Sequence, residues 1–203
     1  TQIAKSPSMF AVPLNSQAKS LKEFVTLVKA SPGQFNFGTY GAGTSSHIQG
    51  SLLNLQAGLD MVHVPFQGAA PLVTNMVGGQ LTSAFIDSAS ARAHVKSFRP
   101  LAVTGTQRMP SLPDVPTFKE LGLEPVNRMA YYGIYGPKGL PKDIVDKINA
   151  GVRKALEDPA VKKRIEETGS FIVANTPEQF AAQMKAEYEV YKKVVDSAKL
   201  KLD

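Results

Sequence analysis

The sequence contains no cysteine, which excludes a disulfide framework, a thiolate nucleophile and a zinc–thiolate site. A cysteine-free chain is compatible with an oxidising compartment. No apolar run approaches the length of a membrane span, so we expect a protein that is not membrane-embedded. No signal peptide precedes Thr1 and the chain does not start with methionine. We therefore expect a chain that was processed or cut from something longer.

Clustered positive charge is also lacking, although the net charge is +6. Residues 1–130 carry 10 basic and 6 acidic side chains, and residues 131–203 carry 13 and 11. A nucleic-acid interface gathers Lys and Arg on one face with aromatic residues between them, so we predict no nucleic-acid partner. With 203 residues, 43% of them hydrophobic, the chain can form one large or two small domains.

Lysine and arginine are missing from Ala30 to Ala91, where the only charges are Asp60 and Asp87. Within this stretch, an apolar run breaks into glycines and hydroxyl residues between Phe37 and His47. We interpret it as a strand, a turn and a helix N-terminus, since Gly allows positive φ and Ser and Thr cap helices. Such a turn directs unpaired N–H groups and a positive dipole end outward. The pattern predicts an anion site without basic side chains.

Phosphate-binding motifs fit this loop poorly. A P-loop has Lys after its last glycine, where this chain has Thr44, and a dinucleotide fingerprint needs Gly where Ser46 stands. Asp60 precedes the next predicted strand instead of closing it. Two alternatives stay open: the glycines only make a tight strand-to-helix connection, or an α/β enzyme binds a phosphorylated substrate or nucleotide at Gly41–Gly43.

The order of apolar segments predicts βαβ units with a parallel sheet. Predicted strands are Met9–Pro13, Phe35–Thr39, Val62–Pro65, Leu81–Ile86 and Pro100–Val103. Predicted helices begin after the cap Ser20, after the glycine loop (with Ile48, Leu52, Leu53 and Leu55 inward), at Pro71 and at Ala89, the last two ending at Val77 and Val95. Three strand-to-helix loops then open at one sheet edge, where ligands of α/β sheets bind. The expected cleft residues are Thr39, Tyr40, Gly41, Thr44, Ser45, Gln67, Gly68, Ala69 and Asp87.

Further along, Met109–Thr117 carries three prolines and is expected to run extended, followed by a short helix Phe118–Leu121. Strands are predicted at Tyr131–Tyr135 and Phe171–Val173, and helices from Leu140, over Ala160–Thr168 and from Thr176. The predicted inward residues of the first and last of these helices are Ile144, Val145, Ile148, Val152, Leu156, Phe180, Met184, Tyr188, Tyr191 and Val195. Helices of this kind need a sheet, so residues not present or a partner chain must complete it.

Several ordered motifs together resemble one family. They are Phe35–His47, His63–Pro71, Gly78–Gln80, Leu101–Val103, Leu112–Thr117 and Glu120–Gly122. From about Met9 to the C-terminus, the chain is similar to the Bug-type (TctC-like) extracytoplasmic solute-binding receptors of tripartite tricarboxylate transporters. The run Ile86–Arg92 departs from the family's pattern.

The resemblance implies an α/β fold of the periplasmic-binding-protein type (type II, Venus flytrap) that closes over a small carboxylate. The family's opening glycine-rich loop is not in this sequence, so we expect one complete lobe at residues 13–129 and an incomplete second lobe at 1–12 and 130–203. It implies a periplasmic, non-enzymatic receptor for a mono-, di- or tricarboxylate or amino acid, with membrane transporter subunits as partners. Carried over by position, the ligand-binding residues are Thr39, Gly41, Gly43, Thr44, Ser45, Gln67, Gly68, Ala69, Asp87 and Tyr132. With half of the clamp absent, this chain is expected to bind carboxylates weakly or not at all.

Chemistry beyond binding has little support in the sequence. His47 falls in the first turn of a predicted helix, where packing and hydrogen bonding are the simpler interpretation than a general base. His63 lies in a strand and His94 at a helix end, and no metal-ligand spacing joins the three. We therefore predict no catalytic residue, metal or cofactor. Asp87 suits a helix N-cap and a ligand contact equally, and Tyr40 and Tyr132 suit a pocket wall or the core.

Overall fold

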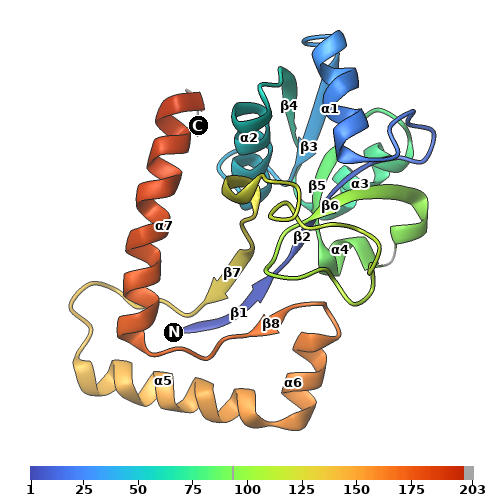
Figure 1. Ribbon diagram of the computed structural model, residues 1–203. Coiled ribbons are helices and arrows are strands. Elements are labelled where there is room, and N and C mark those ends of the chain that lie inside the picture. Colours follow the sequence, from blue (N-terminus) through green and yellow to red (C-terminus); the bar gives the residue numbers. More distant parts are fainter. Residues whose placement is uncertain (93, 199–203) are drawn as a thin grey trace.

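The computed structural model describes residues 1–92 and 94–198, which form a larger and a smaller α/β unit (Figure 1). The larger unit is built on a sheet of order β4-β3-β5-β2-β6, and the smaller on one of order β7-β1-β8. The strands are β1 (Gln2–Ser6), β2 (Ser8–Pro13), β3 (Phe35–Thr39), β4 (Met61–Pro65), β5 (Ala84–Asp87), β6 (Phe98–Val103), β7 (Ala130–Gly133) and β8 (Phe171–Ile172).

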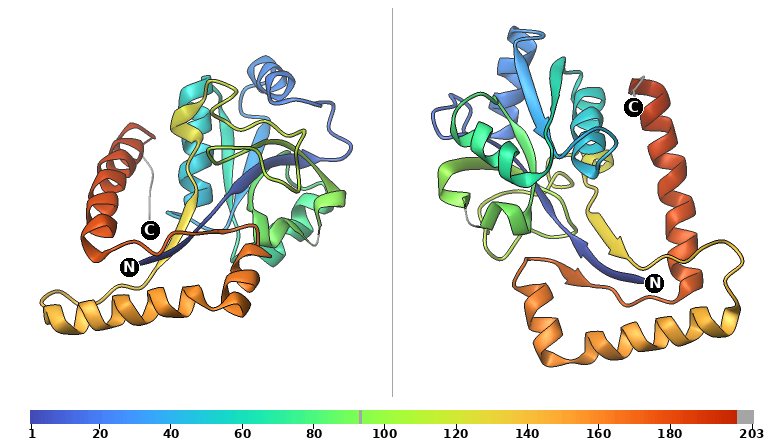
Figure 2. Two further views of the ribbon diagram at one scale, coloured as in Figure 1. Left: turned by 60° about the horizontal axis from the view of Figure 1, so that its bottom comes forward. Right: turned by 180° about the vertical axis from the view of Figure 1, so that it is seen from behind.

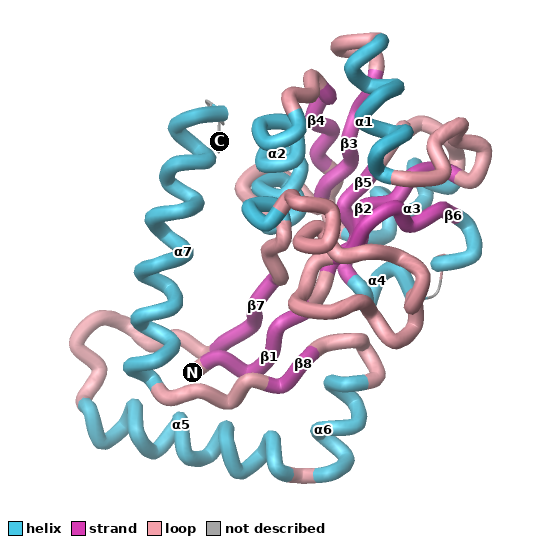
Figure 3. The backbone as a smooth tube through the Cα atoms, viewed as in Figure 1, coloured by secondary structure: helices cyan, strands magenta, loops and turns pink. Residues whose placement is uncertain are grey.

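Helices surround both sheets (Figure 3). They are α1 (Leu21–Ala30), α2 (Ser45–Ala57), α3 (Ala69–Val77), α4 (Ser88–Arg92), α5 (Lys142–Glu157), α6 (Pro159–Glu166) and α7 (Pro177–Ala198), with 3₁₀ turns η1 (Val95–Ser97) and η2 (Glu124–Val126). α5 and α6 lie beside the smaller sheet, and α7 runs alongside α2 of the larger unit in both Figures 1 and 2. No helix among the described residues is long and apolar enough to cross a membrane.

The predicted parallel pairing is confirmed for the strands that carry the loops. β3 pairs in parallel with β4, with Thr39 opposite Pro65, and with β5 through Gly38 and Ala84. The three strand-to-helix loops therefore open at one edge of the sheet. β2 lies between β5 and β6 and runs antiparallel to both, so the prediction of a parallel sheet is wrong for the strand Met9–Pro13.

Strand β2 forms the centre of the larger unit because both of its faces are covered. Phe10 and Val12 pack in a cluster with residues of α1 and α2, whereas Met9 and Ala11 pack in another cluster with residues of α3. Alternate residues of a strand point to opposite faces, which explains the division. The sequence places residues 8–12 in the smaller unit, but β2 pairs with the larger sheet, so the chain changes sheets at Pro7. The division into lobes by residues 13–129 stays a proposal.

The predicted helix start at Ser20 is confirmed. Ser20 Oγ accepts a hydrogen bond from the Glu23 amide at 3.2 Å. Glu23 Oε2 in turn accepts from the Lys19 amide at 2.7 Å, one residue before the cap. The strand Phe35–Thr39 has its predicted bounds, and α2 ends at Gly58, whose φ of 61° is left-handed.

Some local predictions are wrong. β5 begins at Ala84 instead of Leu81, because the preceding Ser83 side chain bonds Asn36 O at 2.7 Å. The helix predicted over Ala89–Val95 is α4 followed by η1, and residue 93 lies outside the described residues. The Met109–Thr117 segment is a series of turns rather than extended, with Leu112 N to Met109 O at 2.9 Å and Val115 N to Leu112 O at 3.1 Å.

The short helix predicted at Phe118–Leu121 is a turn instead. The Leu121 amide donates to Thr117 O at 3.2 Å, and Glu120 Oε2 accepts from the Thr117 amide at 2.7 Å. The carboxylate thus satisfies a local amide, and the chain turns at Gly122, where φ is +74°.

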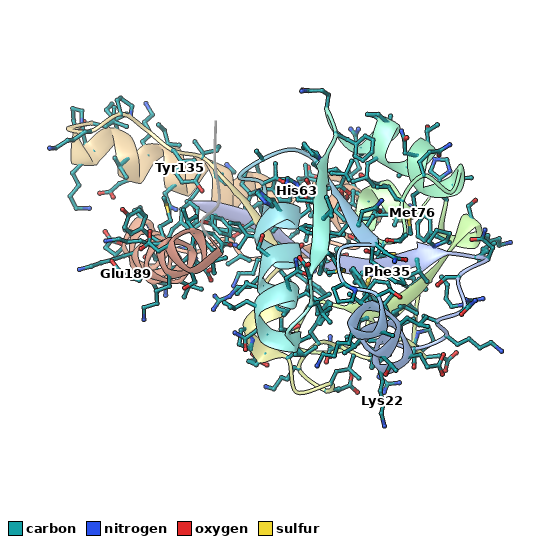
Figure 4. The ribbon with its side chains drawn as sticks, turned by 90° about the horizontal axis from the view of Figure 1, so that it is seen from above. Lys22, Phe35, His63, Met76, Tyr135 and Glu189 are labelled. Atoms are coloured by element: carbon teal, nitrogen blue, oxygen red, sulfur yellow. The ribbon has the colours of Figure 1, made fainter. Side chains whose placement is uncertain are left out.

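In the smaller unit, the apolar faces predicted to point inward are partly exposed. Ile144 and Ile148 of α5 are exposed, as are Met184 and Tyr188 of α7, while Leu156 and Phe180 are buried. Leu55 of α2 is also exposed, against prediction. In the smaller unit, the apolar side chains of α5 and α7 remain exposed because the three-stranded sheet covers only part of these helices. Figure 4 shows Tyr135 and Glu189 in this unit, apart from Phe35 and Met76 of the larger one.

Contacts on two sides connect the units beside the crossing strand. Ser88 Oγ, at the start of α4, lies 3.2 Å from Ser6 Oγ and donates to Thr168 O at 2.8 Å. On the other side, Val194 of α7 is buried in the same cluster as Ile48 and Leu52 of α2.

Candidate functional site

The predicted anion loop lies at the molecular surface between β3 and α2. Ala42 and Gly43 are exposed, while Thr39 at the end of β3 is fully buried. Gly41 and Gly43 have φ of 128° and 73°, a region that favours glycine. The loop is tied to its neighbour through the hydrogen bond from the Phe66 amide to Thr39 O at 3.0 Å.

Several loop amides already have acceptors, which corrects the expectation of a continuous unpaired row. The Tyr40 amide donates to Ser46 Oγ at 3.1 Å. The Gly41 amide donates to Thr39 Oγ1 at 3.3 Å, and the Gly43 amide to His47 Nδ1 at 3.1 Å. These three amides hold the loop together and are not available to a ligand.

The N-terminus of α2 keeps its free donors. Thr44 occupies the N-cap with extended backbone, but its side chain makes no capping bond and instead donates to Gly41 O at 2.8 Å. In the part of the chain that the structure describes, the amides of Ala42, Ser45 and Ser46 have no acceptor. A helix end without a cap carries partial positive charge, so these amides can hold an anion.

Asp87 is held by several hydrogen bonds. Its Oδ2 accepts from Tyr40 Oη at 2.6 Å and from Ser90 Oγ at 2.7 Å, and its Oδ1 accepts from the Ser90 amide at 2.9 Å. The last bond has the geometry of an N-cap on α4. Of the two roles left open by the sequence, the structure thus supplies the cap, and the carboxylate is largely satisfied within the protein.

Tyr40 joins the first loop to this carboxylate. Its hydroxyl also accepts a hydrogen bond from the Asp87 amide at 2.7 Å. Burial first, and then the charge of Asp87, raise the pKa of Tyr40 well above its ordinary value. The phenol therefore stays protonated and remains a donor to Asp87 throughout the physiological range.

Several of the remaining predicted residues line one of two cavities. Gly43 and Ser45 line a cavity of about 380 Å³ together with Tyr132 of β7 and Tyr191 of α7, so this cavity has walls from both units. Ala69 lines another cavity of about 460 Å³, next to Ser90. Gly68, with φ of 99°, is the N-cap of α3, and Gln67 beside it is exposed.

Tyr132 lies close enough to Asp87 for the carboxylate charge to affect its hydroxyl. Its side chain is exposed, yet partial burial and, secondarily, the charge of Asp87 raise its pKa. The structure thus brings Ser45, Tyr132 and the Tyr40–Asp87 pair to one region, while Ala69 lines the second cavity and Gln67 lines neither.

Two histidines behind the loop were weighed by sequence only as packed residues. The His47 ring on α2 stacks on the His63 ring of β4 with centroids 3.7 Å apart and planes at 8°. His63 Nε2 lies 2.6 Å from Thr39 Oγ1. Burial lowers the pKa of His47, and burial together with the neighbouring His47 ring lowers that of His63 to about 4. The sequence does place His47 four residues after Gly43, in the first turn of the helix. This spacing was the available signal that the ring would contact the loop, as it does through the Gly43 amide.

No group of three or more His, Asp or Glu that could hold a metal ion exists within residues 1–92 and 94–198. A helix N-terminus with free amides, flanked by hydroxyls and a tyrosine from the facing unit, suits a small anion with an apolar part.

Known proteins resemble this chain in sequence and fold. The model of the family described as the tripartite tricarboxylate transporter family receptor matches residues 1–200. The chain belongs to this receptor family. A curated relative from Pseudomonas sp. (strain P51), named as a UPF0065 protein in the tcbD-tcbE intergenic region, is 32% identical over 195 residues. That match covers 95% of this chain and 58% of the relative, so the chain spans little more than half of the relative's length.

Solved structures of such receptors superpose on both units. One described as a periplasmic transporter has a TM-score of 0.90 and 34% identity, covering 100% of this chain and 68% of the other. MatC from Rhodopseudomonas palustris, solved with bound malate, has a TM-score of 0.83 and 28% identity, covering 96% and 68%. The fold is therefore that of the periplasmic solute-binding proteins, as part of a type II binding protein.

Proposed function

We propose that this chain is the ligand-binding part of a periplasmic receptor that captures a small carboxylate and delivers it to a tripartite tricarboxylate transporter. The observation that carries the proposal is the uncapped N-terminus of α2, whose free amides at Ser45 and Ser46 lie in a stretch without Lys or Arg. Malate bound to the related MatC supports a carboxylate as the ligand class.

The strength of such a site follows from its parts. A helix end contributes roughly 0.3–1 kcal/mol, and each hydrogen bond to a charged group roughly 1.5–3 kcal/mol. Two or three such bonds, less the cost of association, suit a reversible complex of about micromolar affinity in a complete receptor. A receptor that must release its cargo needs this range.

Within the proposed site, the ligand carboxylate accepts hydrogen bonds from the backbone amides at the start of α2. Gly41, Gly43 and Thr39 shape the loop that holds these amides in position. Tyr132 closes the site from the smaller unit, and Gln67, Gly68 and Ala69 border it. Tyr40 and Asp87 act together as a wall, since their polar groups bond each other. The role of each of these residues is part of the proposal.

The decisive experiment removes a single amide from α2. Ser45→Pro eliminates the donor at the first helical position, where proline is well tolerated, and the extended Thr44 backbone accepts a following proline. Ser45→Ala is the matched control, because it removes the hydroxyl and keeps the amide. Amide chemical shifts of the ¹⁵N-labelled chain, titrated with malate and adipate, measure affinity into the millimolar range.

We expect carboxylate-dependent shifts at Ala42, Ser45 and Ser46 that saturate, with affinity at least about tenfold weaker in Ser45→Pro than in Ser45→Ala. Inorganic phosphate and a neutral diamide of malate are the comparison ligands. Shifts with phosphate alone favour a phosphate-binding enzyme instead. Equal affinity in the two variants contradicts the proposed site.

A further inference from the structure

The His47–His63 stack lies directly behind the proposed anion loop, and each ring contacts a different point of it. His47 Nδ1 accepts the Gly43 amide at 3.1 Å. His63 Nε2 meets Thr39 Oγ1 at 2.6 Å, and the same hydroxyl accepts the Gly41 amide at 3.3 Å. The two rings thereby determine the orientation of both loop glycines.

The contact with Gly43 defines the protonation state of His47. A ring nitrogen that accepts a hydrogen bond carries no proton, so His47 is neutral with its proton on Nε2. Protonation at Nδ1 replaces the acceptor by a second donor facing the Gly43 N–H, and the two cannot coexist at 3.1 Å. The present loop conformation therefore requires a neutral His47.

The surroundings of the stack keep both rings neutral. The rings line a cavity of about 480 Å³ whose other walls are Phe37 of β3, Ser51, Asn54 and Leu55 of α2, Gly58 and Leu59 beyond it, and Met61 of β4. None of these residues is titratable, so each ring faces only the other as an ionisable group within this cavity. Burial lowers both pKa values, that of His63 also through the neighbouring His47 ring, while the open cavity gives protons access.

We propose that His47, supported by the stacked His63, is a positioning residue that holds the Gly41–Ser45 loop in its anion-receiving conformation while both imidazoles are neutral. The inference rests on the proposed function for its ligand and adds the residue that controls the loop. Because Gly43 N–H is committed to His47, the free amides of Ala42 and Ser45 on either side of it keep a fixed direction.

The test compares two substitutions that differ in one acceptor. Asn in place of His47 can present its side-chain oxygen where Nδ1 now lies, whereas Leu cannot accept a hydrogen bond. We expect His47→Asn to keep the downfield Gly43 amide resonance and bind malate within about threefold of the parent chain. His47→Leu should lose that resonance and bind malate about tenfold more weakly, the usual effect of one lost hydrogen bond to a loop of this kind. His94→Asn, at an exposed position, is the control.

A pH series on the ligand-free chain provides the readout that a merely structural role does not change. The Gly43 amide resonance should be constant above about pH 7 and move as the pH falls toward 4, and this movement should be absent in His47→Asn. A Gly43 resonance that is the same at pH 7 and at the lowest pH at which the parent chain remains folded overturns the proposal. So does an unchanged Gly43 resonance in a folded His47→Leu.

These results are separable from the fate of the proposed function. If the Gly43 resonance behaves as expected but no carboxylate shifts any amide, the loop control stands and the proposed ligand class fails. If His47→Leu does not fold, the pH series on the parent chain and on His47→Asn still decides the matter.

Discussion

The hydroxyl of Tyr40 and the acidic residue Asp87 are joined twice: the phenol donates to Oδ2 at 2.6 Å and accepts from the Asp87 amide at 2.7 Å. The pair connects the loop after β3 to the end of β5, which are far apart in sequence. It thereby fixes the relative position of two of the three loops at the binding edge of the sheet.

Tyr40→Phe should lower the free energy of unfolding by about 1–3 kcal/mol, since the partly buried Asp87 amide loses its acceptor. The raised pKa of Tyr40 adds a pH effect. The unfolded chain ionises this phenol from about pH 10 while the folded chain does not, so stability should fall above pH 10 in the parent chain and less in the variant. Urea unfolding at pH 7 and pH 10.5 measures both, with the exposed Tyr188→Phe as control. A loss below about 0.5 kcal/mol at pH 7 contradicts this assignment.

Thr44→Asp should change stability and ligand binding in opposite directions. An aspartate at the N-cap accepts from the free amides of α2 and complements the dipole, which stabilises a helix by about 1 kcal/mol. The same carboxylate occupies the proposed ligand position, so malate affinity should fall at least about tenfold. Thr44→Ser should leave both nearly unchanged, and the neutral cap in Thr44→Asn should fall between them. Denaturation and malate titration would refute the prediction if both quantities dropped together in Thr44→Asp.

His63 makes stability pH-dependent in the acid range. Its pKa is about 4 in the folded chain, whereas an unfolded histidine titrates near 6.5, so the unfolded state takes up the proton first. The free energy of unfolding should therefore fall as the pH decreases from about 6.5 to about 4 and then stop changing with this group. His63→Gln should flatten the profile in this window. A parent profile that is already flat there, measured by urea unfolding in steps of half a pH unit, counts against the lowered pKa.

Helix α5 offers a comparison between an exposed and a buried apolar residue on one element. Ile148 is 41% exposed and Leu156 is 7% exposed. Ile148→Lys should change the free energy of unfolding by no more than about 0.5 kcal/mol, whereas Leu156→Lys should cost more than about 2 kcal/mol because it buries a charge. Thermal unfolding of the two variants tests this. A large loss for Ile148→Lys would mean that Ile148 is covered in solution.

The sequence predicted strand β3 and the helix cap at Ser20 correctly because these depend on local chemistry. The side chains of Ser20 and Glu23 accept hydrogen bonds from amides three and four residues away. β3 consists of strand-forming residues and ends where the glycine-rich turn begins. The start of β5 was mispredicted because Asn36, distant in the chain, forms hydrogen bonds with Thr82 and Ser83, the two residues before Ala84. No local pattern encodes that partner.

For the candidate site, the sequence by itself determined the ingredients: glycines with freedom for positive φ, hydroxyl residues before a helix and a stretch free of cations. Only the tertiary structure decided which amides remain free. The side chains of Thr39, Ser46 and His47 accept hydrogen bonds from the other loop amides, and whether they do so depends on distances and angles that the sequence does not specify. It also decided that Asp87 is committed to Tyr40 and Ser90, and that the rings of His47 and His63 meet. Composition fixes the available donors and acceptors, but their pairing depends on how strands far apart in the chain are brought together.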